Sequence, residues 1–329
     1  MARGAQRLGG RVRVRGRELS EDTSPSQHFV LGPSLSPLSR GEGPPYYPRV
    51  EPWLLTHEAT LRGTAFVVLL AGLGLAETFA PRRRPSVPRG FRWLHNLGLI
   101  AVDTLVLRLL SPLLLVEFSL LAQERGLGLL NQLDLPGWAR IVVALPLLDL
   151  AIYWQHRVFH AVPLFWRLHM VHHADPDIDV TTGVRFHPVE MVLSLLIKMA
   201  VVAALGAPPA AVVIFEVLLN ATSMFSHANL NLPPAVDRIV RWLTVTPDMH
   251  RIHHSVRPYE TNSNFGFNHP WWDRLFGSYR DQPEEGHEGM TIGLSQFLER
   301  KRQSLPWMLA LPLTGATGNY PAGDRPADQ

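Results

Sequence analysis

The 329-residue chain is 46% apolar, carries a formal net charge of +3 and contains no cysteine. The absence of cysteine excludes disulfide bonds, iron–sulfur clusters, zinc fingers and thiol catalysis. The apolar residues gather into long runs, separated by short segments rich in arginine or histidine. This distribution is typical of an integral-membrane protein with sizeable polar parts.

The first 50 residues are rich in arginine, glycine, serine and proline and show no hydrophobic periodicity. This composition predicts a disordered, basic and proline-rich tail over residues 1–52. The segment has no apolar region typical of a signal peptide. It also lacks the aromatic residues that alternate with basic ones in nucleic-acid sites, so we expect no nucleic-acid partner.

Five apolar runs are long enough, or nearly so, to cross a membrane as helices. We predict the spans at residues 60–80, 97–121, 139–155, 189–205 and 210–226. The last two are slightly short and are joined by Gly-Ala-Pro-Pro, so they resemble a helical hairpin. The predicted fold is all-α, an integral-membrane helical bundle over residues 53–285 that is followed by a C-terminal tail over residues 286–329.

The segment between the first two spans, PRRRPSVPRGFR, contains five arginines. By the positive-inside rule these arginines place this loop in the cytoplasm. Counting crossings from there brings residues 156–173, residue 227 and residues 250–254 to the same face. We therefore predict a multi-pass membrane protein with a histidine-rich cap on the cytoplasmic side.

Nine of the 15 histidines fall into three groups, which we call the histidine boxes. The first contains HRVFH and HMVHH, the second is the histidine of SHANLN, and the third is HRIHH. Histidines separated by three or four positions share one face of a helix. Imidazole suits iron, zinc, copper or nickel rather than magnesium or calcium. The boxes therefore predict a site that can enclose two transition-metal ions.

Other metal and cofactor chemistries have little support. The zinc-protease motif HExxH is missing, because the His-Glu pairs at His57 and His287 have Leu61 and Thr291 in the fifth position. A carboxylate di-iron bundle needs two ExxH motifs, and only Glu284 begins one. No dinucleotide fingerprint, phosphate-binding loop or GxSxG motif occurs.

The ordered boxes, with DLAIYWQHR at their start and NFGFNHPWWDRLFGSY after them, resemble the fatty acid hydroxylase/sterol desaturase superfamily over about residues 90–280. The resemblance implies a membrane bundle with a cytoplasmic cap, two non-haem iron ions, and O2-dependent hydroxylation or desaturation of a lipid C–H bond. The lipid would be a fatty acyl chain, a sterol or a related molecule. Matching the boxes residue by residue implies these metal ligands: His156, His160, His169, His172, His173, His227, His250, His253 and His254.

Three further residues are candidates for a metal ligand or for the support of one. Asn231 stands four residues after His227, where some family members have a second histidine. His187, in the HPxE-like element RFHPVE, is either a ligand or a histidine at a helix start. Asp149 lies seven residues before His156 on the same helical face, so it would orient a ligand imidazole or make a polar helix contact. We expect no catalytic residue beyond the ligands.

The resemblance also bears on partners. Fused family members carry a haem-binding HPGG module, which this sequence lacks, so electrons would come from a separate cytochrome b5-like or ferredoxin-like donor. The lipid substrate would enter from the membrane and react with O2. Two alternatives stay open: a non-enzymatic metal- or lipid-binding membrane protein, and a zinc-dependent membrane hydrolase.

Overall fold

Five helical segments that are long and apolar enough to cross a membrane frame the structure. The structure, a computed structural model, describes residues 50–111, 114–314 and 317–320. Within these ranges it contains helices and turns but no β-strand. The prediction of an all-α, multi-pass membrane bundle is therefore confirmed. The spans are α2 (Glu58–Phe79), a segment that starts with α3 (Arg89–Leu110), α6 (Gly137–Ala161), α8 (Pro188–Leu205) and α9 (Pro209–His227).

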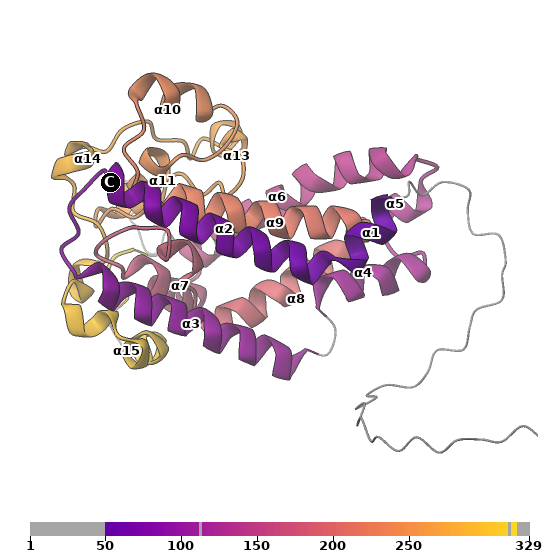
Figure 1. Cartoon of the computed structure of the whole chain (residues 1–329), viewed down its shortest axis with the longest axis horizontal. Helices are drawn as coiled ribbons and strands as arrows, with labels where there is room; N and C mark the ends of the chain where they lie inside the picture. Colours follow the sequence, from indigo (N-terminus) through magenta and orange to yellow (C-terminus); the bar gives the residue numbers. More distant parts are fainter. Residues whose placement is uncertain (1–49, 112–113, 315–316, 321–329) are drawn as a thin grey trace, which may run out of the picture. The chain divides into compact units, whose positions relative to one another are not determined.

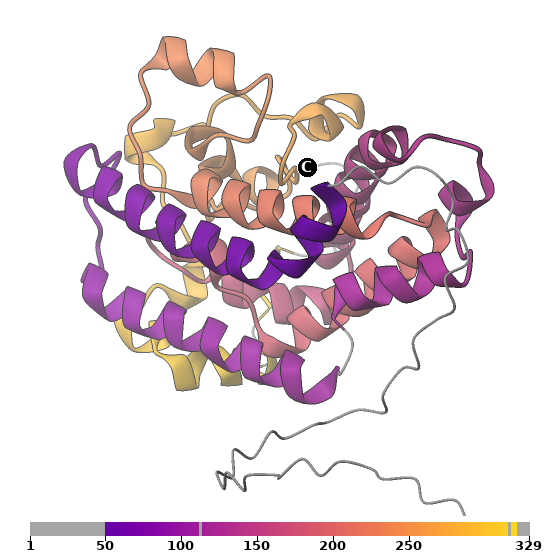
Figure 2. The ribbon, with the colours of Figure 1, turned by 45° about the vertical axis from the view of Figure 1, so that its right-hand side comes forward.

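Successive spans run in opposite directions, so one end of the bundle collects the C-terminal ends of α2, α6 and α9 (Figure 1 and Figure 2). There Pro81, after α2, pairs with Leu230, after α9. At the other end a Cβ on Gly128 would lie 2.1 Å from the backbone nitrogen of Gly206, the residue that ends α8. Both glycines have positive φ angles, 91° and 70°, so this close approach requires glycine at both positions.

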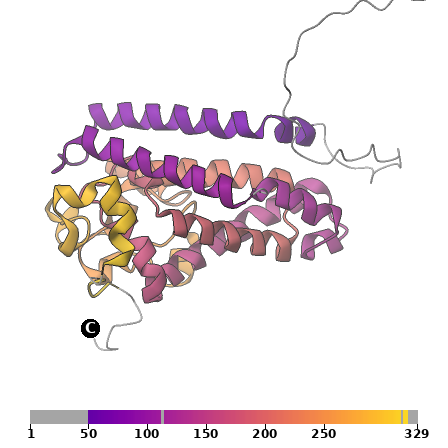
Figure 3. The same ribbon diagram turned by 90° about the horizontal axis from the view of Figure 1, so that it is seen from below.

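Short helices gather at the end of the bundle where α2, α6 and α9 finish, and we call this region the cap (Figure 1). Figure 3 shows the C-terminal helices of the cap, in yellow, at the same end of the bundle. The cap elements are α7 (Pro163–His173), η1 (Thr182–Val184), α10 (Pro234–Val240), α11 (Pro247–His253), α12 (Pro258–Thr261), α13 (Trp271–Leu275), α14 (Gly286–Gly289), η2 (Ser295–Phe297), η3 (Arg300–Gln303), α15 (Leu305–Ala310) and η4 (Leu311–Leu313).

The second span differs from the single helix predicted over residues 97–121. The helix α3 begins earlier and ends at Leu110, and two further helices, α4 (Leu115–Glu124) and α5 (Leu129–Gln132), follow it. The sequence between α3 and α4 contains Pro112, which lacks the backbone N–H that an unbroken helix needs. The early start was missed because Arg92 looked like a loop residue, whereas its charge is neutralised by buried carboxylates.

The predicted N-terminal tail lies almost entirely outside the described residues. Helix α1 (Val50–Thr56) takes in the last three residues of the predicted tail, over residues 50–52. The division of the chain at residue 53 therefore stays a prediction.

The predicted C-terminal tail packs against the rest of the protein as far as it is described. Phe297, Met308 and Leu311 are buried in one hydrophobic cluster with Trp166 of α7. The sequence did not predict this packing, because the apolar residues of the segment are spread among turn-forming residues and show no helical period. The segment after residue 285 thus supports the first part of the histidine-bearing region.

A buried ion-pair network joins α3 to the loop that follows α7. Arg92 is 1% exposed and donates two hydrogen bonds of 2.7 Å to the carboxylate of Asp175. The same guanidinium contacts Asp179, and the nearby Asn96 donates to Thr181 at 3.0 Å. Because this loop leads into η1, the network fixes the chain between the first histidine box and α8.

We expect Arg92→Met to lower the stability of the protein by about 3–5 kcal/mol, because it leaves two buried carboxylates without their partner. Unfolding of the detergent-solubilised protein measures the loss. Arg84→Met, which changes an exposed arginine in the loop before α3, is the matched control and should have little effect. Equal stability of the two variants would contradict a structural role for the network.

Candidate metal centre

Four helices bring the nine box histidines together. Helix α6 supplies His156 and His160. Helix α7 carries three histidines on one face, and α9 ends at His227. Helix α11 starts at a proline, behind Thr246, whose side chain accepts a hydrogen bond from the backbone of Met249. All nine imidazoles are buried; the remaining box histidines are His169, His172, His173, His250, His253 and His254.

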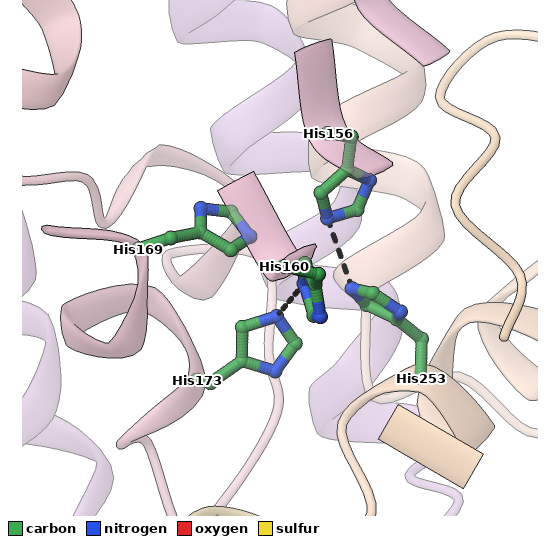
Figure 4. Close-up of side chains that lie close together, drawn as sticks. All are labelled: His156, His160, His169, His173 and His253. Atoms are coloured by element: carbon green, nitrogen blue, oxygen red, sulfur yellow. Dashed lines mark hydrogen bonds between the residues drawn. The ribbon is translucent and has the colours of Figure 1, made fainter. Parts of the chain in front are cut away.

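The nine histidines form two groups, one of five and one of four, in each of which the nearest nitrogens lie within 4.8 Å of one another. The rings of the first group point toward a common space between α6, α7 and α11 (Figure 4). The first group, the five-histidine group, is His156, His160, His169, His173 and His253. The second, the four-histidine group, is His172, His227, His250 and His254.

Hydrogen bonds on the outer side of the rings fix how these imidazoles face. The Nδ1 atom of His156 lies 2.8 Å from the carbonyl oxygen of Phe265, and that of His253 lies 2.7 Å from the carbonyl oxygen of Ser263. A carbonyl oxygen can only accept, so Nδ1 carries the proton in both rings. The Nε2 atom of each neutral ring is then left with a lone pair. The equivalent Nδ1 contacts are His172 to the Arg185 carbonyl, His227 to the Ser223 carbonyl, His160 to Asn262 and His169 to Glu190.

The Nε2 atoms converge in pairs whose spacing suits two ligands of one metal ion. The Nε2 atoms of His156 and His253 lie 3.0 Å apart. In the four-histidine group, Nε2 of His227 lies 3.0 Å from Nε2 of both His172 and His250. Lone pairs at this distance repel each other, whereas neighbouring nitrogens bound to one metal ion at ~2.1 Å are separated by about 3 Å. The donors therefore fit a metal ion in each group.

Some box histidines lie outside the membrane spans, and burial keeps their rings in the neutral form that binds a metal ion. Removal from water disfavours the imidazolium ion, and this lowers the pKa of His172 and His253 well below its ordinary value. The pKa of His169 falls to about 3 for the same reason. Neutral imidazole is the form that coordinates a metal ion.

The loop between α12 and α13 holds the carbonyl groups that orient His156 and His253. Asp273 accepts hydrogen bonds of 2.8 Å from the backbone of Phe265 and of Gly266. Asn264, at a positive φ of 52°, donates to the carbonyl of Met249. A side chain on Gly266 would come within 2.6 Å of the carbonyl oxygen of His269. The residues of NFGFN are therefore those that a tight turn at this position requires, and the turn places the Phe265 carbonyl beside His156.

The three additional candidates from the sequence do not join either group. Asp149 accepts from Trp272 Nε1 at 2.8 Å and from the backbone of Asn268, so it anchors α13 and the loop before it to α6 instead of orienting an imidazole. His187 caps α8: its Nδ1 accepts from the backbone of Val189, and its Nε2 faces a carbonyl. Asn231 is exposed, whereas all nine box histidines are buried.

The residues that do orient ligands include two that sequence reasoning missed. Glu190 lies 2.7 Å from His169 Nδ1, and Asn262 lies 3.3 Å from His160 Nδ1. Glu190 belongs to the HPVE element, in which the sequence drew attention to the histidine and not to the glutamate. No spacing rule identifies Asn262, because it contacts His160 only when two segments far apart in the sequence come together in the folded protein.

A cavity of about 280 Å³ reaches the five-histidine group from the membrane-spanning part of the bundle. His156 and His169 form part of its wall. Much of the rest is apolar and includes Ile152, Phe159 and Leu195. The cavity can therefore hold a hydrocarbon chain beside the five-histidine group and keep bulk water away from it.

The metal centre lies within a segment that matches a known family. The family model for fatty acid hydroxylase matches residues 141–278, which include both histidine groups. Residues 141–278 are a fatty acid hydroxylase domain. The resemblance inferred from the histidine boxes is thereby confirmed. No solved structure matches the chain significantly.

Curated relatives of this fatty acid hydroxylase domain act on several lipids. Alkylglycerol monooxygenase of Xenopus tropicalis is 30% identical over 45% of this chain and 32% of its own length. Ornithine lipid hydroxylase of Rhizobium tropici is 28% identical over 46% of this chain and 45% of its own length. Methylsterol monooxygenase 2-2 of Arabidopsis thaliana is 24% identical over 51% of this chain and 62% of its own length. The chain thus spans less than half of the length of the first two relatives.

We expect His250→Ala to reduce the metal content to about one ion per chain, because it removes a ligand of the four-histidine group alone. Elemental analysis after anaerobic reconstitution with ferrous iron gives the content. His187→Ala is the matched control, since this buried imidazole belongs to neither group. A similar loss of metal from both variants would show that the assignment of the groups is wrong.

Proposed function

We propose that this protein is a membrane di-iron oxidoreductase that uses O2 to hydroxylate or desaturate a C–H bond of a lipid. The observation that carries the proposal is the pair of buried imidazole groups beside an apolar cavity. The printed names of the relatives, two monooxygenases and one hydroxylase, favour hydroxylation over desaturation. The nine box histidines are the proposed ligands, and the fatty acid hydroxylase domain is the proposed catalytic region.

The donor set favours iron over zinc. Zinc sites are almost always four-coordinate, and catalytic zinc keeps only three protein ligands and a water molecule. The five-histidine group offers more imidazoles than such a site uses. Imidazole also suits iron, and a pair of iron ions supplies the redox chemistry that O2 activation needs.

The residues of this chain position the lipid and exclude water from the reaction. Apolar side chains such as Phe159 and Phe267 line the cavity and would hold a hydrocarbon chain against the five-histidine group. Hydroxylation consumes an O2 molecule, a pair of electrons and a pair of protons, and it yields the alcohol and water. The electrons have to come from a separate donor, for which we retain a cytochrome b5-like or ferredoxin-like protein.

Iron-loaded protein should consume O2 only when a lipid substrate and a reductant are present. We expect His253→Ala to lower this lipid-linked O2 uptake by at least about 100-fold, because a ligand of the five-histidine group is lost. Product mass spectrometry with ¹⁸O2 checks that the oxygen enters the lipid, and Asn231→Ala serves as a control that retains activity. Zinc-loaded protein that converts lipid without O2 would favour the hydrolase alternative.

We further propose that the cap faces the cytoplasm. The arginine-rich loop between α2 and α3 lies at the same end of the bundle as the cap, and arginines favour the cytoplasmic side (Figure 1). The ligands at the ends of α6 and α9 would then lie near the cytoplasmic surface of the membrane.

The absence of native cysteine makes this orientation directly testable. Arg84→Cys, in an exposed position of the arginine-rich loop, should react with a membrane-impermeant maleimide only after cells are permeabilised. Asp134→Cys, exposed at the opposite end between α5 and α6, should react in intact cells. The reverse pattern would place the cap outside the cytoplasm.

A further inference from the structure

Two buried carboxyl groups face the cavity where it meets the metal centre. Asp103 of α3 and Glu190 of α8 line the cavity together with His156 and His169. Both carboxyl groups are almost fully buried, at 2% and 3% exposed. They lie outside both histidine groups, and the contact of Glu190 with His169 uses only one of their four oxygens.

Each of these carboxyl groups has an oxygen without a hydrogen-bond partner. Among the described residues, neither Oδ1 of Asp103 nor Oε2 of Glu190 receives a hydrogen bond. The other oxygen of Glu190 is used, because it lies 2.7 Å from Nδ1 of His169. A buried acceptor without a donor is unfavourable, so a group that occupies this part of the cavity gains by donating to these oxygens.

The charged residues farther from the metal centre are already paired with one another. Glu216, near the start of α9, lies 3.0 Å from Arg62 and 3.3 Å from Lys198. These charges line the same cavity but compensate each other. Glu216 thus has a cation beside each of its oxygens, whereas among the described residues neither Asp103 nor Glu190 forms an ion pair with a lysine or an arginine.

We propose that Asp103 and Glu190 bind the polar headgroup of the substrate through hydroxyl or ammonium groups that donate hydrogen bonds. Because Glu190 contacts a ligand imidazole with its other oxygen, the headgroup is held beside the metal centre. The carbon that reacts then lies within a few bonds of the headgroup, and the hydrocarbon tail extends along the apolar wall of the cavity. This inference rests on the proposed lipid oxygenase function and narrows its substrate to lipids with a donor headgroup.

The position of the metal centre in the bundle agrees with this orientation. The ligands His160 and His227 lie at the ends of the spans α6 and α9. The ends of spanning helices meet the polar headgroup region of a membrane, whereas the hydrocarbon tails lie along the middle of the helices. Glu190 is the third residue of α8 and therefore also lies near the end of a span, so a lipid that enters from the membrane brings its headgroup to the level of Glu190 with little displacement.

The first test is a binding experiment that needs no turnover. Displacement of a fluorescent lipid from the iron-loaded protein in nanodiscs compares a hexadecyl glycerol ether having free hydroxyls with the same ether having methylated hydroxyls. Hexadecylamine and hexadecyltrimethylammonium form a second pair, which keeps the charge and removes the donors. We expect a preference of at least about tenfold for the donor-bearing member of one pair, and the pair concerned identifies hydroxyl or ammonium.

Variants then assign the preference to one end of the cavity. Asp103→Leu replaces a buried carboxyl group by an apolar side chain of similar size and should abolish most of the preference. Glu216→Gln, at the other end of the same cavity, is the matched control and should leave the preference in place. If Glu216→Gln abolishes the preference and Asp103→Leu does not, the headgroup binds at the other end and our inference is wrong.

If Asp103→Leu does not fold, lipid binding by the wild-type protein still tests the inference. Equal binding within both lipid pairs overturns the inference, whatever the oxygenase activity. Analysis of the product provides an independent check: oxygen inserted next to the headgroup supports it, and oxygen inserted in the middle of the tail contradicts it. A donor preference without any O2-dependent conversion would instead refute the proposed function and leave the headgroup site standing.

Discussion

The orientation of the imidazole rings is the constraint on which the rest of the structure depends. Nitrogen atoms of buried rings converge to about 3 Å, and six of the nine rings are held in this orientation by an oxygen of the protein at their opposite edge. Most of these oxygens belong to the backbone, so the path of the chain itself sets the geometry. Asp273 holds the backbone of Phe265 in place, and the Arg92 network holds the loop that follows α7.

The parts of the fold and site that depend on local sequence could be predicted. Apolar runs gave all five spans, and the spacing of the histidines gave the ligand faces of α6, α7 and α11. The alternation of the spans also placed the three boxes at one end of the bundle, where the structure has them (Figure 1). These inferences succeed because a helix converts sequence spacing directly into a spatial relation.

The parts that depend on contacts between distant segments could not be predicted. Asp149 has the spacing of a residue that supports His156, but its carboxylate accepts a hydrogen bond from the indole of Trp272 instead. Glu190 has no spacing relation to His169, yet it makes the contact that was expected of Asp149. The C-terminal segment likewise looked like a tail, because its few apolar residues become a packed surface only when α7 is beside them.

The distribution of ligands along the chain has a consequence for biosynthesis. His254 is the last box histidine, and the carbonyl groups that orient His253 and His156 come later still, at Ser263 and Phe265. A ribosome that has made all five spans has therefore not yet released a complete metal centre. We expect the helices to enter the membrane first and metal ions to bind afterwards, to a bundle already in place, as one of the final steps of maturation.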